Sequence, residues 1–553
     1  MFKKVVVGLI AIVLVVIAAS RFVPVGDIVD PLTYFDEFKE NEYNLVYDDQ
    51  RINLKNPVKI IDGKIYISYE VVRDYLDTVI FYDEAEKIMT ITDVRNVLRL
   101  YPNSDKARLN GKEVQVEYSI KTIDDMLYVP EDLLRDKAGI EITPGQENKL
   151  YIINDITKGS QIGTIRRSTS LRTHPLQKTT VIETLKRGEK VVVFSIEDGF
   201  ARVRSENGII GYIPEDNLKD LTDVAGRALS SIETWPSNPL GEKVRLVWDQ
   251  VTVQTAGDWN STKYSRVTEA NVISPTWFQF ADENGNLSDL GNKAYVDNAH
   301  KRGLQVWALI SHNFTEPGLT EVVLSSTAKR QFVIDQLIEK ARLYGYDGIN
   351  IDIENIQTET SAVWVQFMRE LYPQLKAAGI LVTVDVYMPS NWSSHYERAK
   401  ISGLCDYFIV MAYDQHHLGS EEAGSVAEIP WVEDGIKKNL EEVPNDKLVL
   451  GIPFYTRLWK ETAHGLETRS YTMSAAEAKV KEWGVTPTLD PNSGQPYAEK
   501  KVEDGTYKIW LETSETIAAR IQLANKYDLA GYGAWKLGLE TLDSWDSLAL
   551  LEK

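Results

Sequence analysis

The sequence predicts a multidomain chain: an N-terminal membrane helix, an α+β repeat domain, a small β-barrel, and a C-terminal α/β domain that is a (β/α)8 barrel. Three observations support this fold class. After residue 242, eight strand-like apolar runs alternate with helical stretches. The N-terminal half contains an internal repeat, which short strands at regular spacing follow. All 13 tryptophans lie at or after Trp235, which places small-molecule chemistry in the C-terminal segment.

Composition and charge are those of a globular protein and exclude several classes of function. The chain has 553 residues, 43% of them hydrophobic and 26% charged, which excludes a largely disordered or fibrous protein. The net charge of −20 repels phosphate backbones, so we expect no nucleic-acid partner. The single cysteine, Cys405, excludes an internal disulfide and a cysteine-based metal cluster. His416 and His417 are adjacent and would face opposite sides of a strand, so we expect no metal site.

The N-terminus carries a membrane signal. Lys3 and Lys4 precede an apolar run over residues 5–19. Because the basic residues stand before the run, the rest of the chain is expected outside the cytoplasm. We expect residues 1–25 to form an uncleaved membrane anchor, since Ile17 is large for the outer position of a cleavage site. A cleaved signal segment is the alternative.

An internal repeat follows a predicted linker over residues 26–49. Its two copies align at an offset of 62 residues, and the identical pairs are Tyr66 with Tyr128, Arg73 with Arg135 and Asp74 with Asp136. Each copy predicts a strand, a helix and a strand pair; the pairs are 79–82 with 88–91 and 140–142 with 150–153. One such unit cannot bury its apolar face alone, so the two copies are expected to pack together.

This repeat, which we assign to residues 50–156, resembles the copper amine oxidase N-terminal-like domain. That module is common in bacterial surface proteins. Its name implies no copper site, and the segment contains no cluster of histidine and cysteine. We interpret the domain as a stalk that acts as a spacer.

Residues 157–220 predict the small β-barrel. The pattern of short apolar strands and turns resembles a bacterial SH3-like domain. In that family the position of Phe200 is often Trp, and the Gly-Tyr pair, here Gly211 and Tyr212, closes the barrel. The resemblance implies either binding of cell-wall peptide or a second spacer, and the sequence leaves both open. A linker is expected over residues 221–241, which contain serine and proline.

The C-terminal segment, residues 242–553, alternates strands with helices. Its eight strand-like runs are 244–248, 271–278, 305–310, 348–353, 381–387, 407–413, 448–453 and 531–535. Helical stretches include 327–343 and 361–378. In such a barrel, catalytic groups belong at the C-terminal ends of the strands.

The fourth strand, Asp-Gly-Ile-Asn-Ile-Asp-Ile-Glu, carries the sharpest signal. Side chains alternate along a strand, so Asn350, Asp352 and Glu354 share one face, which we expect to point into the barrel. Buried polar groups are costly unless they pair with one another or with a ligand. We assign Asp347, which has the other parity, and Gly348 structural roles at the start of the strand.

Asp352 and Glu354 are close enough to titrate as a coupled pair. We expect the inner carboxyl, Asp352, to stay ionised and the outer one, Glu354, to have a raised pKa. A glutamate with a raised pKa is what a general acid needs at neutral pH.

At this strand the chain resembles glycoside hydrolase family 18, whose signature is Asp-x-x-Asp-x-Asp-x-Glu. The sequence departs at one position, where Asn350 replaces an acidic residue. That replacement is typical of the branch containing spore cortex-lytic and germination-type N-acetylglucosaminidases. It affects proton sharing between the two inner positions, because Asn350 can hydrogen-bond Asp352 but cannot take a proton.

Three further segments resemble the same family in the same order: Met-Ala-Tyr-Asp, Gly-Ile-Pro-Phe-Tyr-Thr-Arg and Gly-Tyr-Gly-Ala-Trp. The resemblance implies that Tyr413 holds the acetamido group of the substrate and that Trp535 forms the floor under the reacting sugar. The other substrate-binding candidates from these motifs are Met411, Asp414, Tyr455 and Arg457. Trp277 is a further candidate; it, Trp392 and Trp459 either line the cleft or pack in the core.

The family's mechanism is substrate-assisted hydrolysis with retention and without a cofactor. The resemblance implies that Glu354 is the acid and base, that Asp352 orients the acetamido N–H, and that the substrate carries N-acetyl groups. We expect peptidoglycan as the substrate of an N-acetylglucosaminidase. The alternatives are a chitinase acting on chitin oligomers and a non-catalytic glycan-binding protein of the cell surface.

The segment between Arg457 and Gly531 leaves room only for a small insertion, which favours a shallow groove over a deep chitinase cleft. The four parts together predict an extracytoplasmic protein of a Gram-positive cell envelope, membrane-anchored or secreted. Its expected partners are N-acetylated polysaccharide, the cell wall through the SH3-like domain, and the membrane through the N-terminal helix.

Overall fold

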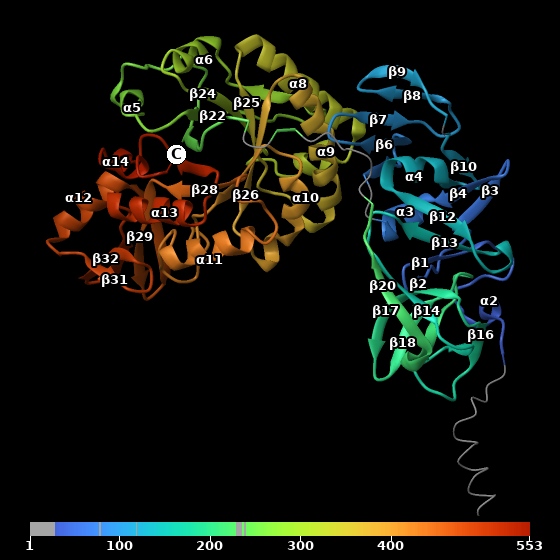
Figure 1. Cartoon of the computed structure of the whole chain (residues 1–553). Helices are drawn as coiled ribbons and strands as arrows, with labels where there is room; N and C mark the ends of the chain where they lie inside the picture. The colour runs from blue at the N-terminus through green and yellow to red at the C-terminus, as the bar shows by residue number, and fades with distance from the viewer. Residues whose placement is uncertain (1–27, 77–78, 118, 228–234, 237–238, 553) are drawn as a thin grey trace, which may run out of the picture. The chain divides into compact units, whose positions relative to one another are not determined.

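The computed structural model describes residues 28–76, 79–117, 119–227, 235–236 and 239–552 (Figure 1). The chain forms two compact units: Met1–Ile91 with Leu98–Ile232, and Thr92–Val97 with Glu233–Lys553. The membrane anchor predicted over residues 1–25 lies outside the described residues. Within the described part of the chain, no helix is both long and apolar enough to cross a membrane.

The repeat domain is built from short strands, three short α-helices and one 3-10 helix. Its elements are α2 (Pro31–Tyr34), β1 (Asn44–Tyr47), β2 (Gln50–Arg51), β3 (Val58–Ile61), β4 (Lys64–Ser68), α3 (Tyr69–Tyr75), β5 (Ile80–Asp83), β6 (Ile88–Thr92), β7 (Val97–Leu100), β8 (Lys106–Leu109), β9 (Lys112–Gln115), β10 (Lys121–Ile123), β11 (Met126–Pro130), α4 (Glu131–Ala138), β12 (Ile140–Pro144), η1 (Gln146–Asn148) and β13 (Leu150–Asp155). Three sheets result, in the strand orders β12-β13-β1-β2, β10-β11-β4-β3 and β5-β6-β7-β8-β9.

The two copies of the repeat pair directly with each other. Strands β4 and β11 are antiparallel, and Ile67 lies opposite Val129, the residue at the equivalent position of the second copy. The two copies are therefore related by a local two-fold axis through this pair. Both side chains are fully buried in one core, to which the helices contribute Val71, Val72, Leu133 and Leu134. Each copy thus covers the apolar face that the other cannot bury alone.

The expected linker over residues 26–49 is partly ordered structure, which corrects that prediction. Strand β1 lies within it, all four of its residues are buried, and it pairs in parallel with β13. A run of four residues flanked by polar side chains shows no clear period. Its partner strand comes from the far end of the domain, so the pairing is a long-range feature that local pattern does not reveal.

The SH3-like domain is a seven-stranded sheet with the order β16-β15-β19-β18-β17-β14-β20. Its elements are β14 (Ser160–Ile165), β15 (Thr169–Arg172), β16 (Val181–Leu185), β17 (Lys190–Glu197), β18 (Phe200–Arg204), β19 (Ile210–Pro214), η2 (Glu215–Asn217) and β20 (Leu218–Val224). Tyr212 pairs with Arg172 across β19 and β15. At Gly211 a Cβ would lie 2.6 Å from the Arg172 carbonyl oxygen, so glycine permits this close approach. Strand β20 extends into the segment predicted as a linker from residue 221.

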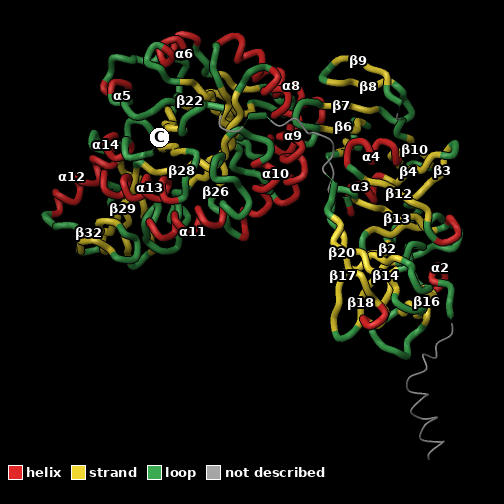
Figure 2. Tube along the Cα trace, in the orientation of Figure 1, coloured by secondary structure: helices red, strands yellow, loops and turns green. Residues whose placement is uncertain are grey.

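The C-terminal unit contains a closed barrel of eight parallel strands (Figure 2). The strands are β21 (Val244–Asp249), β22 (Val272–Phe280), β24 (Gln305–Ser311), β25 (Gly348–Asp352), β26 (Leu381–Tyr387), β27 (Tyr407–Met411), β28 (Leu448–Pro453) and β34 (Gly531–Trp535). Strand β21 closes the barrel by pairing with both β22 and β34. The predicted (β/α)8 barrel is confirmed. Near-continuous apolar strands made it recognisable, because both faces of a parallel sheet are covered.

Helices surround the barrel and connect its strands. They are α5 (Thr262–Ser265), α6 (Lys293–His300), α7 (Leu319–Leu324), α8 (Thr327–Tyr344), η3 (Thr358–Thr360), α9 (Ser361–Ala377), η4 (Asn391–Tyr396), α10 (Arg398–Ser402), α11 (Ile429–Asn439), α13 (Ser514–Lys526) and α14 (Ser544–Leu548); β23 (Leu287–Asp289) is a short antiparallel addition to β22. Helix α8 is capped at its start by Ser326, whose side chain accepts from the Lys329 N–H, and at its end by Gly345 in the left-handed conformation. These caps place the start of β25 directly after the helix.

A small α+β insertion separates β28 from β34. It consists of β29 (Tyr455–Thr462), β30 (Gly465–Thr472), α12 (Met473–Trp483), β31 (Thr488–Asp490), β32 (Gln495–Val502) and β33 (Gly505–Trp510). The strands form one sheet with the order β30-β29-β33-β32-β31. Its own small core contains Leu458, Val480, Trp483 and Ile509. The first residues of β29 reach back to the barrel, where they contact the site described next.

Candidate active site

A small pocket opens at the C-terminal ends of the barrel strands. It has a volume of about 140 Å³ and is lined by Trp248, Asp352, Glu354, Asp385, Met411, Tyr413, Asp414 and Trp535. We call it the acidic pocket, because four of its eight lining residues are carboxylic acids. The lining residues come from β21, β25, β26, β27 and β34 or from the residues that follow them, the location at which (β/α)8 barrels hold their chemistry.

Asn350 lies below the pocket with every hydrogen-bonding group used. Its Oδ1 accepts from Trp248 Nε1 at 2.8 Å and from Ser274 Oγ at 3.1 Å. Its Nδ2 donates to Thr383 Oγ1 at 3.0 Å and to Asp385 Oδ1 at 2.7 Å. The expected hydrogen bond from Asn350 to Asp352 is replaced by one to Asp385, because the neighbouring strand β26 supplies a closer carboxylate.

Asp352 is the last residue of β25, lines the acidic pocket and is 8% exposed. Its Oδ1 is buried and has no hydrogen-bond partner among the described residues. Burial raises the pKa of the Asp352 carboxyl well above its ordinary value, and the neighbouring carboxyls of Glu354 and Asp385 raise it further. The direction of this shift is opposite to the one expected from the sequence, because a third carboxyl crowds the pair and no ion pair joins these three carboxyls to a cation in the described part of the chain.

Glu354 follows the end of β25 and is partly exposed. Its backbone N–H donates to His312 Nδ1 at 3.3 Å, and its carboxyl accepts a hydrogen bond from the Tyr387 hydroxyl. Burial raises the pKa of the Glu354 carboxyl; the hydrogen bond from Tyr387 opposes this shift, and the charge of Asp414 adds to it. A partly exposed carboxyl with a raised pKa has the properties of a general acid.

Asp385 is a site residue that the sequence analysis did not single out. It lies on β26, is 3% exposed, and lines the pocket beside Asp352 and Glu354. Burial raises the pKa of its carboxyl well above the ordinary value, the hydrogen bond from Asn350 opposes the shift, and the charge of Glu354 adds to it. The signal that could have found it is a single acid within an apolar strand, at the same parity as Thr383 and Tyr387.

Met411, Tyr413 and Asp414 all line the acidic pocket, although strand alternation would send Asp414 to the other face. Strand β27 ends at Met411, and Asp414 adopts the left-handed conformation with φ of 56°, which turns its side chain inward. The Tyr455 hydroxyl donates to Asp414 Oδ1 at 2.6 Å, and Arg457 Nη2 lies 3.5 Å from the same oxygen. Tyr455 and Arg457 thus hold Asp414 from the insertion rather than from a barrel strand.

Tyr413 packs edge-on against Tyr455, with the ring centroids 6.3 Å apart. Burial raises the pKa of the Tyr413 hydroxyl well above its ordinary value, and the charge of Asp385 adds to this. The hydroxyl therefore keeps its proton at neutral pH and can donate a hydrogen bond into the pocket.

The tryptophans of the barrel divide into pocket and core residues. Trp535 is partly exposed in the pocket, with its ring 6.0 Å from that of the buried Trp248. Trp277, by contrast, is 1% exposed and packs in the core beside Tyr295, so it does not reach the pocket. Trp459 is also buried and donates to the Gly424 carbonyl.

Trp392 is the exposed exception. It is 61% exposed, and its ring centroid lies 4.9 Å from that of Tyr387, the residue that hydrogen-bonds Glu354. Phe314 is similarly exposed at 63%, against the ring of His312. Two exposed aromatic side chains therefore stand next to residues that contact Glu354.

Asp347 and Gly348 lie at the opposite end of β25. Asp347 Oδ2 accepts from the Val306 N–H at 2.8 Å and lies 2.8 Å from His300 Nε2, which joins β24 and α6 to the start of the strand. At Gly348 a Cβ would lie 2.7 Å from the Trp307 ring, so only glycine fits. Both residues are remote from the acidic pocket and hold the strand in place.

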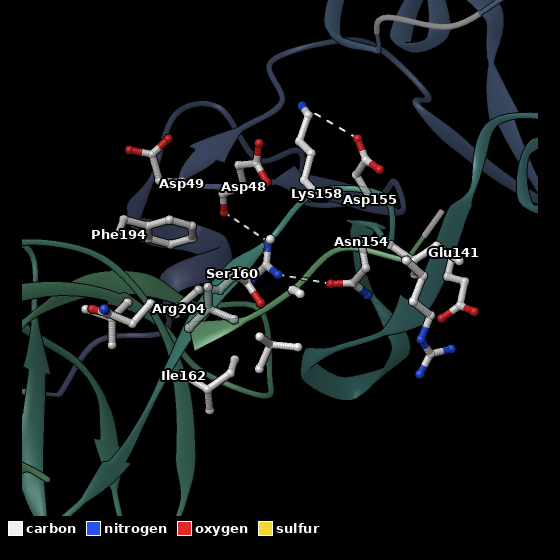
Figure 3. Close-up of a pocket in the computed structure, with 18 residues that line it drawn as sticks. Asp48, Asp49, Glu141, Asn154, Asp155, Lys158, Ser160, Ile162, Phe194 and Arg204 are labelled. Carbon is white, nitrogen blue, oxygen red and sulfur yellow. Dashed lines mark hydrogen bonds and ion pairs between the residues drawn. The ribbon is translucent and has the colours of Figure 1, made fainter. Parts of the chain in front are cut away.

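A larger pocket lies in the N-terminal unit, where β13 of the repeat domain approaches β14 and β17 of the SH3-like domain (Figure 3). Its volume is about 700 Å³. Arg204, which is 7% exposed, donates to the Asp48 carbonyl and to Asn154 Oδ1, each at 3.0 Å. Lys158 lies 3.6 Å from Asp155. Arg204 and Lys158 therefore both have partners within the protein.

No set of three or more histidine, cysteine, aspartate or glutamate side chains in the described part of the chain is arranged to hold a metal ion.

Comparison with known proteins decides the family. Residues 253–540, just over half of the chain, match glycosyl hydrolases family 18. The chain belongs to this family. Two further matches lie upstream: the copper amine oxidase N-terminal domain over residues 42–153 and a bacterial SH3 domain over residues 167–219. All three predicted resemblances are thereby confirmed, and so is the prediction of a glycosidase.

The similar proteins include two from Bacillus subtilis. The uncharacterized glycosylase YvbX is 29% identical over 313 residues, which cover 53% of this chain and 89% of YvbX. A cortical fragment-lytic enzyme is 23% identical over 236 residues, which cover 41% of this chain and 54% of that protein. The chain therefore spans only about half the length of that enzyme.

Among solved structures, the Bacillus cereus spore cortex-lytic enzyme SleL has a TM-score of 0.51 at 18% identity. The match covers 56% of this chain and 75% of that chain. At this identity it supports the barrel fold alone.

Proposed function

We propose that this family 18 glycosidase is a retaining N-acetylglucosaminidase and that its substrate is peptidoglycan. The observation that carries the proposal is the acidic pocket. It holds an unpartnered buried carboxylate oxygen on Asp352, an acid with a raised pKa at Glu354, and the partly exposed indole of Trp535. An indole face stacks well on the C–H face of a pyranose ring, and a carboxylate is the natural partner of an acetamido N–H.

The proposed mechanism begins with proton transfer from Glu354 to the glycosidic oxygen. The carbonyl oxygen of the substrate's own 2-acetamido group attacks the anomeric carbon as the bond to the leaving group breaks, and an oxazolinium ion forms. Asp352 holds the acetamido N–H and stabilises the positive charge, and Tyr413 donates a hydrogen bond to the attacking oxygen. Glu354 then takes a proton from water, which attacks the anomeric carbon and gives retention.

Two features favour peptidoglycan over chitin. Similar proteins include a cortical fragment-lytic enzyme, and the bacterial SH3 domain is the kind of module that binds cell-wall peptide. The insertion between β28 and β34 is small, which suits a bulky, peptide-bearing glycan. Chitin oligomers are the alternative substrate, since class V chitinase of Arabidopsis thaliana is also similar, at 23% identity over 252 residues.

The same features support a place in the cell envelope. The SH3-like domain would hold the enzyme to the wall, and the apolar segment over residues 5–19 would anchor it to the membrane or direct its secretion. The repeat domain would then serve as a spacer between the membrane and the catalytic barrel.

The test is a reducing-end assay with the full-length protein on three substrates: peptidoglycan with muramic lactam, peptidoglycan without it, and chitin oligomers. Glu354→Gln is the control. New reducing ends that carry N-acetylglucosamine and are absent with the variant would support the proposal, and the stereochemistry of the first product would test retention.

If the protein cleaves chitin oligomers faster than peptidoglycan, the substrate would be chitin, the alternative given above. If the wild type and the variant both bind glycan and neither cleaves it, the interpretation as an enzyme would be wrong and the protein would be a non-catalytic glycan-binding protein.

A further inference from the structure

The pairing of β25 with β26 places two buried aspartates side by side. The register joins Asn350 to Thr383 and Ile351 to Val384. One step further along the two parallel strands, Asp352 stands opposite Asp385, and both line the acidic pocket. Neighbouring strands are about 4.8 Å apart, so the two carboxyls are within reach of each other.

Asn350 distinguishes the two oxygens of Asp385. The indole N–H of Trp248 is a donor only, so the atom of Asn350 that faces it must be the oxygen. The amide nitrogen therefore faces Asp385 and donates to its Oδ1 at 2.7 Å. The Trp248 indole also lies within hydrogen-bonding range of the Asp385 carboxyl. A proton held on the other oxygen of Asp385 can be donated to Asp352.

Charge supports the same arrangement. Besides the neutral donors Asn350 and Trp248, the titratable groups that face Asp385 are Asp352 and Glu354 from β25 and its end, and Tyr413 from the end of β27. All of them are acids, and no ion pair links Asp352, Glu354 or Asp385 to a lysine or arginine in the described residues. Two adjacent buried carboxyls without a cation do not both ionise; they hold one proton between them.

We propose that Asp385 is a positioning residue that shares one proton with Asp352 and keeps that proton when Asp352 becomes charged. Before reaction, the pair carries one proton and one negative charge. As positive charge develops on the substrate, the negative charge settles on Asp352 and the proton settles on Asp385. No proton enters or leaves the pair in this step. The inference rests on the proposed function for its catalytic consequence but not for the proton sharing itself.

The experiment compares three variants with the wild-type full-length protein. Asp385→Asn keeps the acceptor for Asn350 but removes the second ionisable group. The exchange variant Asn350→Asp with Asp385→Asn returns a carboxyl to the other neighbour of Asp352. Thr383→Val removes another hydrogen-bond acceptor of Asn350 without changing any titratable group, and serves as the structural control.

The first readout is the pH profile of kcat. We expect Asp385→Asn to lower kcat at least tenfold and to remove one titration step from the profile. The exchange variant should regain at least a third of the lost factor and recover the step, while Thr383→Val should keep the wild-type shape. A wild-type profile for Asp385→Asn, or no recovery in the exchange variant, would overturn the proposal.

The second readout does not require activity. A carboxyl whose pKa is raised in the folded state stabilises the protein fully below its unfolded pKa, and this contribution is lost as pH rises through the folded pKa. The Tm of the wild-type protein should therefore fall more between pH 4 and pH 8 than the Tm of Asp385→Asn. Equal losses would contradict proton sharing, even if no glycan is cleaved by any of the proteins.

Discussion

Two sets of buried carboxyl groups lie in the same catalytic unit, and the protein pairs one set and leaves the other without cations. Outside the barrel strands, Glu512 accepts from both terminal nitrogens of Arg520, at 2.7 and 2.8 Å, and Glu370 accepts from Arg330. All four side chains are fully buried. In the acidic pocket, Asp352 and Asp385 are almost equally buried and have no such partner among the described residues.

This difference distinguishes carboxyls that stabilise the fold from carboxyls that can take part in the reaction. A buried carboxylate paired with an arginine fixes the packing of its neighbours, and the arginine favours its charged form. A buried carboxyl without a cation is costly when charged, so its proton is easily moved by a ligand that brings positive charge. The carboxyls of the acidic pocket therefore stabilise the fold less than paired carboxylates do, but their charge can change when a ligand binds.

The largest effect is expected from Glu354→Gln. The glutamine keeps the shape but cannot donate a proton to the leaving group, so kcat should fall by about 10²–10⁴-fold. A reducing-end assay at the pH optimum measures this, with circular dichroism to verify folding. Activity within threefold of the wild type would remove Glu354 from the role of acid.

Glu512→Gln should act on stability instead. It leaves the Arg520 charge buried without its partner, which typically costs about 3–5 kcal/mol. Urea unfolding followed by tryptophan fluorescence measures the loss, since all tryptophans lie at or after Trp235. The matched control is Glu482→Gln, which removes an exposed partner of Lys479 and should change stability by less than about 1 kcal/mol. If both variants unfold at the same urea concentration, the buried pairing of Glu512 does not stabilise the fold, and the two sets of carboxyls are not distinguished in this way.

Tyr387→Phe should shift the pH dependence of activity. The hydroxyl of Tyr387 lowers the pKa of Glu354, so its removal raises that pKa. The general acid works only while protonated, and activity is lost as pH rises through its pKa. The alkaline limb should therefore move to higher pH, by about one unit if the bond is worth about 1.5 kcal/mol.

Tyr396→Phe is the control for this shift. The Tyr396 hydroxyl is buried nearby but donates to the Ile353 carbonyl at 3.4 Å instead of to Glu354. Its removal should leave the position of the limb unchanged. A shift of the same size in both variants would mean that the limb does not report the hydrogen bond to Glu354.

The smallest effect is expected at Trp392. Its ring is mostly exposed, so Trp392→Ala should leave stability within about 0.5 kcal/mol. If a sugar of the glycan stacks on this ring, KM for long glycans should rise, by up to about tenfold for a loss of about 1.4 kcal/mol. Leu489→Ala, at an exposed residue of β31, is the control. If the wild type and both variants have the same KM, Trp392 takes no part in binding.

Much of the fold could be predicted from the sequence. The eight barrel strands lie close to the predicted runs, because strands of a parallel barrel are apolar over their whole length and stand out from the amphipathic helices between them. The strand pairs of both repeats were also predictable. Strand β1 was missed, since it is short and its stability comes from pairing with β13, a strand distant in sequence.

The candidate site could be predicted in part. Asp352 and Glu354 follow from alternation along one strand, and Tyr413 and Trp535 follow from family motifs. Trp277 was a further candidate that would either line the cleft or pack in the core, and the structure buries it beside Tyr295. Asp385 was missed because its part in the site depends on a neighbouring strand and not on its own segment.

By itself the sequence determined the order of the domains, the barrel, and the acid pair on the fourth strand, because these depend on periods of two or on motifs read within one segment. Only the tertiary structure decided which acids stand next to each other. The register of β25 and β26 brings Asp385 to Asp352, and the left-handed backbone at Asp414 turns that acid toward Tyr455. The charge state of a buried carboxyl depends on its neighbours in space, and those neighbours come from strands that only the closed barrel brings together.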